Sequence, residues 1–105
     1  EYPSDSVDFS IMSGTYNLAV TRSVSNWEDY IFRCLRRIWA KTERAMIFNL
    51  QCSVGQKAYV SQNNIYYALT DHILQRARGL FGLTKVRKEV RIPQDVTFIV
   101  RRDEF

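Results

Sequence analysis

The residues best placed to contact a ligand lie directly after a run of alternating apolar and polar residues near the N-terminus of the chain. Residues 7–12, VDFSIM, alternate apolar and polar side chains and predict a strand that ends at Gly14. A glycine there lets the backbone take positive φ or lets a ligand approach closely. Two hypotheses therefore stay open for Gly14, a ligand contact or a simple strand stop. The loop over residues 15–25 is long, and long loops at strand ends often carry binding groups.

Other residue types capable of chemistry are isolated from one another. His72 is the only histidine, and without a second histidine or an adjacent cysteine it predicts a surface residue rather than a metal ligand. Cys34 falls on the apolar face of a helix, where a free thiol packs as a small hydrophobe, so we expect Cys34 and Cys52 to be reduced. Without paired carboxylates or a nucleophile beside a base, the sequence predicts neither a catalytic residue nor a metal site.

Basic residues exceed acidic residues modestly. Lys and Arg total 15 against 11 Asp and Glu, which gives a net charge of +4. The densest group lies near the C-terminus and comprises Lys85, Arg87, Lys88 and Arg91. Such a run is typical of one solvated strand face, and a nucleic-acid patch is the alternative.

Length and composition indicate one α/β domain over residues 1–105. Hydrophobic residues make up 46% of the chain and aromatic residues 13%, which excludes a disordered tail and favours a narrow core. No run approaches the ~18 apolar residues that cross a bilayer, and the N-terminus lacks a signal pattern, so we expect a soluble, cytoplasmic protein without a membrane partner. The chain begins with Glu1, which indicates either processing or a fragment of a longer protein.

A continuous apolar run predicts the strand around which the rest is arranged. Residues 45–48 are apolar at every step, so the strand over residues 44–50 should lie inside the sheet with both faces covered. An amphipathic helix over residues 27–41 precedes it, with a capping box formed by Ser25 and Glu28. The aromatic side chains of this helix are expected in the core, and a stacking surface for bases is the alternative.

A second helix and a hairpin complete the expected elements. The helix starts at Thr70 and ends before Gly82, and residues 51–64 before it are read as a loop. Residues 84–91 alternate in polarity and residues 96–102 are mostly apolar, which predicts an antiparallel hairpin with its first strand at a sheet edge and its second inside. The expected fold class is α/β, in the order strand-helix-strand-helix-strand-strand. It has a mostly parallel sheet of about four strands and an antiparallel C-terminal hairpin strand.

This order of elements, together with particular residues, resembles the C-terminal half of class I S-adenosylmethionine-dependent methyltransferases. Residues 7–17 look like the fourth strand of that family and its loop, and residues 27–41 and 44–50 look like the next helix and the fifth strand. Residues 66–73 look like the start of the following helix, and residues 95–102 are similar to the closing strand. In that family the closing strand is antiparallel and lies between the fifth and sixth strands.

The resemblance implies half of a Rossmann-like fold, with S-adenosylmethionine as the cofactor of the complete enzyme. It places Ser13, Gly14 and Asn17 at the methyl-donor pocket, because ligands of such sheets bind outside the strand ends. The family also holds its cofactor through a glycine-rich loop and an acidic residue on earlier strands, and neither is present in these 105 residues. The four glycines are dispersed: Gly14, Gly55, Gly79 and Gly82. We therefore expect this chain alone to bind no cofactor and to be inactive.

Three functions follow as hypotheses. The first is a truncated methyltransferase-like domain whose cofactor half belongs to a missing N-terminal segment. The second is a standalone interaction module that forms a homo-oligomer, such as a homodimer, through the exposed edge of the strand over residues 7–12. The third and least favoured is a nucleic-acid binder that uses the basic hairpin over residues 85–102.

Overall fold

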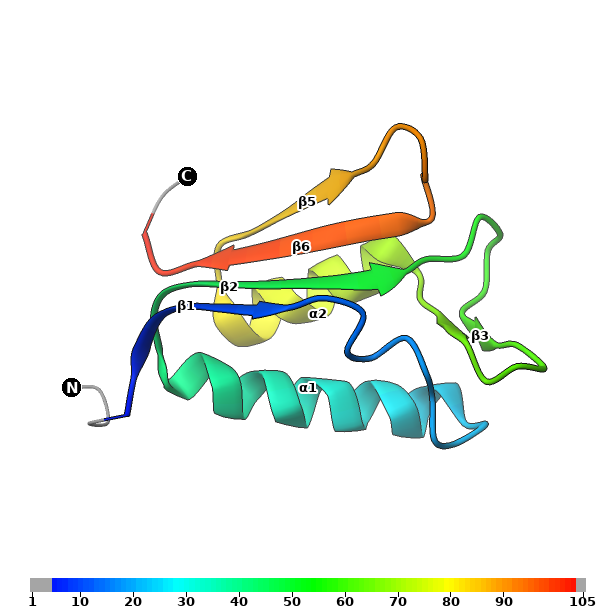
Figure 1. Ribbon diagram of the computed structural model, residues 1–105, viewed down its shortest axis with the longest axis horizontal. Helices are drawn as coiled ribbons and strands as arrows, with labels where there is room; N and C mark the ends of the chain where they lie inside the picture. Colours follow the sequence, from blue (N-terminus) through cyan, green and yellow to red (C-terminus); the bar gives the residue numbers. More distant parts are fainter. Residues whose placement is uncertain (1–4, 104–105) are drawn as a thin grey trace.

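A computed structural model of the chain describes residues 5–103 as two helices and six strands (Figure 1). The elements are, in chain order, β1 (Val7–Met12), α1 (Val24–Ala40), β2 (Thr42–Gln51), β3 (Tyr59–Val60), β4 (Tyr66–Tyr67), α2 (Thr70–Phe81), β5 (Thr84–Lys88) and β6 (Asp95–Arg101). Four strands form the main sheet in the order β1-β2-β6-β5, and β3 pairs with β4 in a separate small ladder. Strand β3 therefore lies in a segment that the sequence predicts as a loop.

The main sheet is mixed, and the prediction of a mostly parallel sheet is wrong. Within residues 5–103, β1 and β2 are the one parallel pair, whereas β6 pairs antiparallel with β2 on one side and with β5 on the other. The short turn between β5 and β6 reverses the chain and inserts β6 next to β2, so both neighbours of β6 run against it. The predicted positions in the sheet are confirmed, since β2 and β6 are interior strands and β5 is at an edge.

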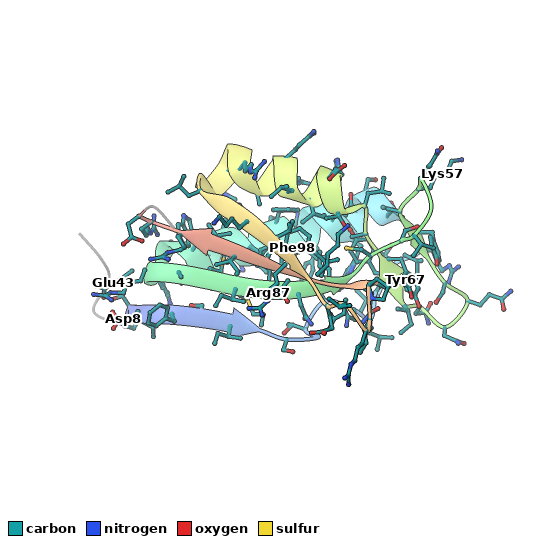
Figure 2. All side chains as sticks on the ribbon, turned by 90° about the horizontal axis from the view of Figure 1, so that it is seen from above. Asp8, Glu43, Lys57, Tyr67, Arg87 and Phe98 are labelled. Atoms are coloured by element: carbon teal, nitrogen blue, oxygen red, sulfur yellow. The ribbon has the colours of Figure 1, made fainter. Side chains whose placement is uncertain are left out.

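The core lies between one face of the main sheet and the two helices. Buried residues alternate along β2 and β6, and the face toward the helices carries Met46 and Phe48 from β2 and Phe98 from β6. The rings of Phe48 and Phe98 stack with their centroids 5.1 Å apart. Figure 2 shows Phe98 between the sheet and the helices and Arg87 on the opposite side. Both helices therefore cover the same face.

The second face of the sheet is open, which corrects the expectation that residues 45–48 are covered on both faces. No helix among residues 5–103 packs on it, yet Ala45 is buried and Ile47 is half-buried there. Side chains in register on the adjacent strands shield them: Phe9 lies beside Ala45, and Ile99 lies beside Ile47. A continuous apolar run thus indicates an interior strand here without indicating a second layer of helices.

The N-terminus of α1 differs from the predicted capping box. Ser23 is the N-cap, and its side-chain oxygen accepts a hydrogen bond from the Asn26 amide at 3.3 Å. Glu28 does not reach back to the helix start, because its carboxylate is buried and accepts a hydrogen bond from the Tyr66 hydroxyl. Ser25 therefore lies in the first turn of the helix instead of preceding it.

Arg102 holds the end of β6 against the junction of α1 and β2. Its guanidinium lies over the Trp39 ring, 3.7 Å from the ring centroid. It donates hydrogen bonds to the Thr42 carbonyl at 3.0 Å and to the Trp39 carbonyl at 2.6 Å. Carbonyl groups in the last turn of a helix lack intrahelical partners, so this cation satisfies one of them and complements the negative end of the helix dipole.

Replacing Arg102 with lysine should destabilise the fold by about 1–2 kcal/mol, because an ammonium group cannot make the paired hydrogen bonds and the flat stacking contact of the guanidinium. The free energy of unfolding in urea measures the change. Arg91→Lys, at an exposed position in the β5–β6 turn, is the matched control and should alter this free energy by less than about 0.5 kcal/mol. Equal effects of the two substitutions would contradict the role given to Arg102.

Candidate functional site

The carboxyl ends of β1 and β2 lie at one end of the sheet, where the loop before α1 meets the loop before α2 (Figure 1). In Figure 2 the labelled Lys57 and Tyr67 mark this end of the molecule, and Asp8 and Glu43 mark the opposite end. The candidate cofactor contacts from the sequence all lie in the first of these loops. Ligands of open α/β sheets bind at such an end, so these loops border the candidate site.

Gly14 occupies a backbone conformation that favours glycine. Its φ is +71°, and its amide donates a 2.7 Å hydrogen bond to the side-chain oxygen of Asn49 near the end of β2. Asn49 in turn donates to the Asp95 carboxylate at 2.9 Å. A side chain at residue 14 would meet the Asn17 side chain at 3.8 Å, which is an ordinary contact. The glycine is therefore required by the backbone conformation and not by a lack of space.

Asn17 connects the same loop to two strands. Its side-chain oxygen accepts a hydrogen bond from the Gln51 amide at 3.3 Å, and its backbone carbonyl accepts one from the Tyr66 amide at 2.8 Å. Ser13 is exposed beside Gly14. The structure thus brings Gly14 and Asn17 against the end of β2, where their hydrogen bonds order the loop. Cofactor contacts by Ser13, Gly14 and Asn17 in a complete enzyme stay a prediction.

Glu28, Tyr66 and His72 form a polar cluster that the sequence pattern does not predict. The Glu28 carboxylate belongs to a residue that is 5% exposed, and it accepts a hydrogen bond from the Tyr66 hydroxyl at 2.5 Å. Its other oxygen lies 3.4 Å from Nε2 of His72. Burial, followed by the hydrogen bond to Glu28, raises the pKa of the Tyr66 phenol well above its ordinary value. Tyr66 therefore stays protonated at neutral pH and donates to the carboxylate.

The three members of this cluster come from three different elements, α1, β4 and α2. One sequence signal points to Glu28: it lies four residues before Phe32 and hence on the face of α1 that packs on the sheet. His72 is confirmed as an exposed residue in the first turn of α2, with 54% of its side chain exposed. The contact between His72 and Glu28 is long-range, so no local pattern reports it.

A shallow hollow of about 420 Å³ adjoins the cluster at the N-terminus of α2, and its wall includes Ser53, Thr70, His72 and Lys88. Because Glu28 contacts the imidazole of His72 from the interior, that ring is oriented at the border of the hollow. An oriented imidazole can exchange a proton with a bound molecule. The hollow itself is open to solvent, and its hydroxyl and ammonium groups can donate hydrogen bonds.

The Cys52 thiol is not activated, and the described residues form no cluster of metal-binding side chains. Cys34 and Cys52 are free thiols, and burial raises the pKa of the Cys52 thiol, opposite to the shift that activates a cysteine nucleophile. Among residues 5–103, no three His, Cys, Asp or Glu side chains are arranged to hold a metal ion. In the same part of the chain, no helix has both the length and the apolarity to cross a bilayer.

The β3–β4 ladder forms an outlying unit at this end of the molecule. The rings of Tyr59 and Tyr67 stack across it with their centroids 4.8 Å apart. Arg22, in the loop before α1, donates hydrogen bonds to the Val60 carbonyl at 3.2 Å and to the Ser61 carbonyl at 2.7 Å. The ring pair thus joins β3 to β4, Arg22 connects β3 to the loop before α1, and the buried Tyr66 anchors β4 in the core.

Comparisons with known proteins add no assignment to this site. No protein-family model matches the chain, and neither a curated protein nor a solved structure matches it.

Tyr66→Phe should lower the free energy of unfolding by about 1–3 kcal/mol, because it leaves a buried carboxylate without its hydrogen-bond donor. Thermal or urea unfolding measures the loss. Tyr67→Phe is the matched control on the same strand, since it keeps the ring that stacks on Tyr59, and it should cost less than about 0.5 kcal/mol. In Glu28→Leu/Tyr66→Phe both polar groups are gone, and the loss should be smaller than in the single variant. A Tyr66→Phe protein as stable as the control would refute this account of the cluster.

Proposed function

We propose that this chain is a methyltransferase-like module without methyl-transfer activity of its own, and that it functions by binding a second copy of itself through β1. The observation that carries the proposal is the exposure of this strand. Phe9 is 55% exposed and Ile11 is 71% exposed, on a strand at the edge of the sheet. Large apolar side chains on an edge strand with open backbone groups favour pairing with another strand.

The order of the strands supports the relation to methyltransferases. The last strand, β6, lies between β2 and β5 and runs antiparallel to both. This is the arrangement that the sequence resemblance implies for the closing strand of the family. In that family, earlier strands continue the sheet beyond the strand that β1 resembles. Strand β1 would then be an edge strand because the earlier strands of the family are not among the 105 residues of this chain.

The apolar surface continues from β1 across the open face of the sheet. Ile11 lies in register with Ile47, and Ile47 lies in register with Ile99, so the three isoleucines form a row over three strands. Val7 adds a further apolar side chain that is 47% exposed. Fully burying a Phe or Ile side chain contributes about 1.5–3 kcal/mol, so covering the exposed parts of Phe9 and Ile11 would contribute roughly 2–4 kcal/mol per copy.

A two-fold arrangement with β1 beside β1 of the second copy fits the distribution of charge. Antiparallel pairing of two identical edge strands is self-complementary, and it brings Phe9 and Ile11 of both copies together in the middle of one continuous sheet. The basic strand β5, on which Lys85 and Arg87 are exposed, lies at the opposite edge of the sheet. Its positive charges on the two copies therefore stay far apart.

The mass of the protein in solution tests the self-association. Light scattering after gel filtration should give twice the 12.4 kDa of one chain at micromolar concentration. Ile11→Lys places charges at the interface and should weaken association at least about tenfold. Val90→Lys, at a 91% exposed position in the turn beside the opposite edge of the sheet, should leave association unchanged. A monodisperse monomer, or equal effects of the two substitutions, would refute the proposal.

Calorimetric titration tests the other part of the proposal. S-adenosylmethionine added to this chain should give no saturable heat, because the glycine-rich loop and the acidic residue that hold it in the family are not among these residues. The ligand should also leave the midpoint of thermal unfolding unchanged, since a molecule that does not bind the folded state cannot stabilise it. Saturable binding would show that the loop with Ser13, Gly14 and Asn17 suffices for a cofactor site, against the expectation.

A further inference from the structure

The outer surface of α1 carries a concentrated positive charge. Residues 33–41 include Arg33, Arg36, Arg37 and Lys41 and no Asp or Glu. The charge of this segment is therefore +4, which equals the net charge of the whole chain. The three arginines are exposed. No carboxylate within residues 5–103 forms an ion pair with any of them. Lys41 pairs with Asp5 at 2.8 Å, so the three arginines carry the positive charge that no described carboxylate compensates.

Folding alone does not explain this charge. Arg33 and Arg37 lie one helical turn apart, as do Arg37 and Lys41, and like charges at this spacing destabilise a helix. The helix dipole favours a cation in the last turn, which includes Arg37. Asp29 lies one turn before Arg33, but its carboxylate pairs with Arg76. A surface that keeps such repulsion is suited to receive negative charge from another molecule.

Two adjoining hollows follow the same surface. The first has a volume of about 370 Å³ and is lined by Asp29, Phe32, Arg33, Arg36, Arg76 and Leu80. The second has a volume of about 360 Å³ and is lined by Arg33, Arg36, Arg37 and Ala40. The one carboxylate in these walls, on Asp29, pairs with Arg76 at 2.8 Å. The walls therefore stay positive, and Arg33 and Arg36 border both hollows.

An exposed aromatic ring extends this basic surface. Tyr30 is 44% exposed, and its ring stacks on the buried ring of Trp27 with the centroids 5.1 Å apart. Tyr30 precedes Arg33 by three residues and Arg37 by seven, so the three side chains follow one line along the helix. Trp27 supports the Tyr30 ring from the interior, which leaves a preformed aromatic platform beside the arginines.

We propose that the outer surface of α1 binds single-stranded nucleic acid, with Arg33, Arg36 and Arg37 on the phosphates and the Tyr30 ring stacked on a base. Planar guanidinium groups match phosphate oxygens in two-point hydrogen bonds. An aromatic ring among cations is typical of surfaces for single strands, whose bases are free to stack. An acidic peptide would use the arginines but would gain nothing comparable from the ring.

This surface is separate from the other candidate surfaces of the molecule. The helix α1 runs along the length of the sheet on its covered face (Figure 1), whereas the apolar residues of the proposed self-association lie on the open face. It is also distinct from the basic hairpin over residues 85–102, which the sequence offers as a nucleic-acid patch. The two basic regions are on different elements, and substitutions can test them one at a time.

Fluorescence anisotropy with a labelled oligouridine of about 15 nucleotides tests the proposal. Affinity should fall with salt with a log–log slope of about −2, as expected for about three phosphate contacts by a single strand. The α1 triple variant, in which Arg33, Arg36 and Arg37 become glutamine, should lose at least about 30-fold in affinity at low salt. Glutamine is a good helix former, and circular dichroism checks that the fold is retained.

A matched control removes the same charge from the β5 side of the molecule. With Arg87, Lys88 and Arg91 replaced by glutamine, affinity for the oligouridine should fall less than about threefold. Tyr30→Leu keeps an apolar side chain on Trp27 but removes the aromatic face. It should weaken binding of the oligouridine about tenfold and leave binding of a DNA duplex of similar length within about twofold.

The outcomes separate this surface from the alternatives. Absence of binding at low salt, equal losses in the two triple variants, or a duplex bound as tightly as the oligouridine would overturn the proposal. Polyglutamate bound as tightly as the oligouridine would also overturn it, in favour of an acidic protein partner. Ile11→Lys should bind the oligouridine with unchanged affinity per chain, so failure of the self-association does not count as failure of this site.

Discussion

The insertion of β6 between β2 and β5 is the constraint on which the rest of the structure depends. Its backbone pairs with β2 from Arg101 to Asp95 and with β5 from Val100 to Val96, so both of its edges are satisfied. This single placement makes β2 an interior strand and β5 an edge strand. Arg102, directly after β6, ties the same strand to the end of α1. Strand β1, on the other side of β2, has one neighbour among the described strands.

The second consequence is that the two faces of the sheet differ. The covered face packs Phe48 and Phe98 against both helices and also encloses the polar cluster centred on Glu28. The open face carries apolar side chains with no helix above them among residues 5–103. The basic surface of α1 lies beyond the core on the covered side. An apolar surface for a protein strand and a charged surface for a polyanion therefore occupy opposite sides of a thin molecule.

Local patterns in the sequence predict the elements better than their arrangement. The apolar run over residues 45–48 correctly predicts an interior strand, but burial on the open face comes from in-register neighbours such as Phe9 and Ile99, which no local pattern reports. The mostly parallel sheet was wrong because β6, correctly expected inside the sheet, pairs antiparallel with both β2 and β5, which leaves β1 and β2 as the parallel pair of the main sheet. The capping box failed because Glu28 finds a partner, Tyr66, that is distant in sequence. Of the candidate site, the strand end and its loop could be predicted, whereas the cluster of Glu28, Tyr66 and His72 could not.

The β3–β4 ladder has a consequence for how the protein opens. Both strands have two residues, and β3 is held by the stacking of Tyr59 on Tyr67 and by the hydrogen bonds of Arg22. Tyr66 anchors β4 in the core, whereas β3 carries no fully buried side chain, so separating β3 would cost few buried apolar contacts. Its amides should exchange with solvent at a free-energy cost well below that of global unfolding. Proteases that require an extended substrate should nick the loop around it first and leave the four-stranded body intact.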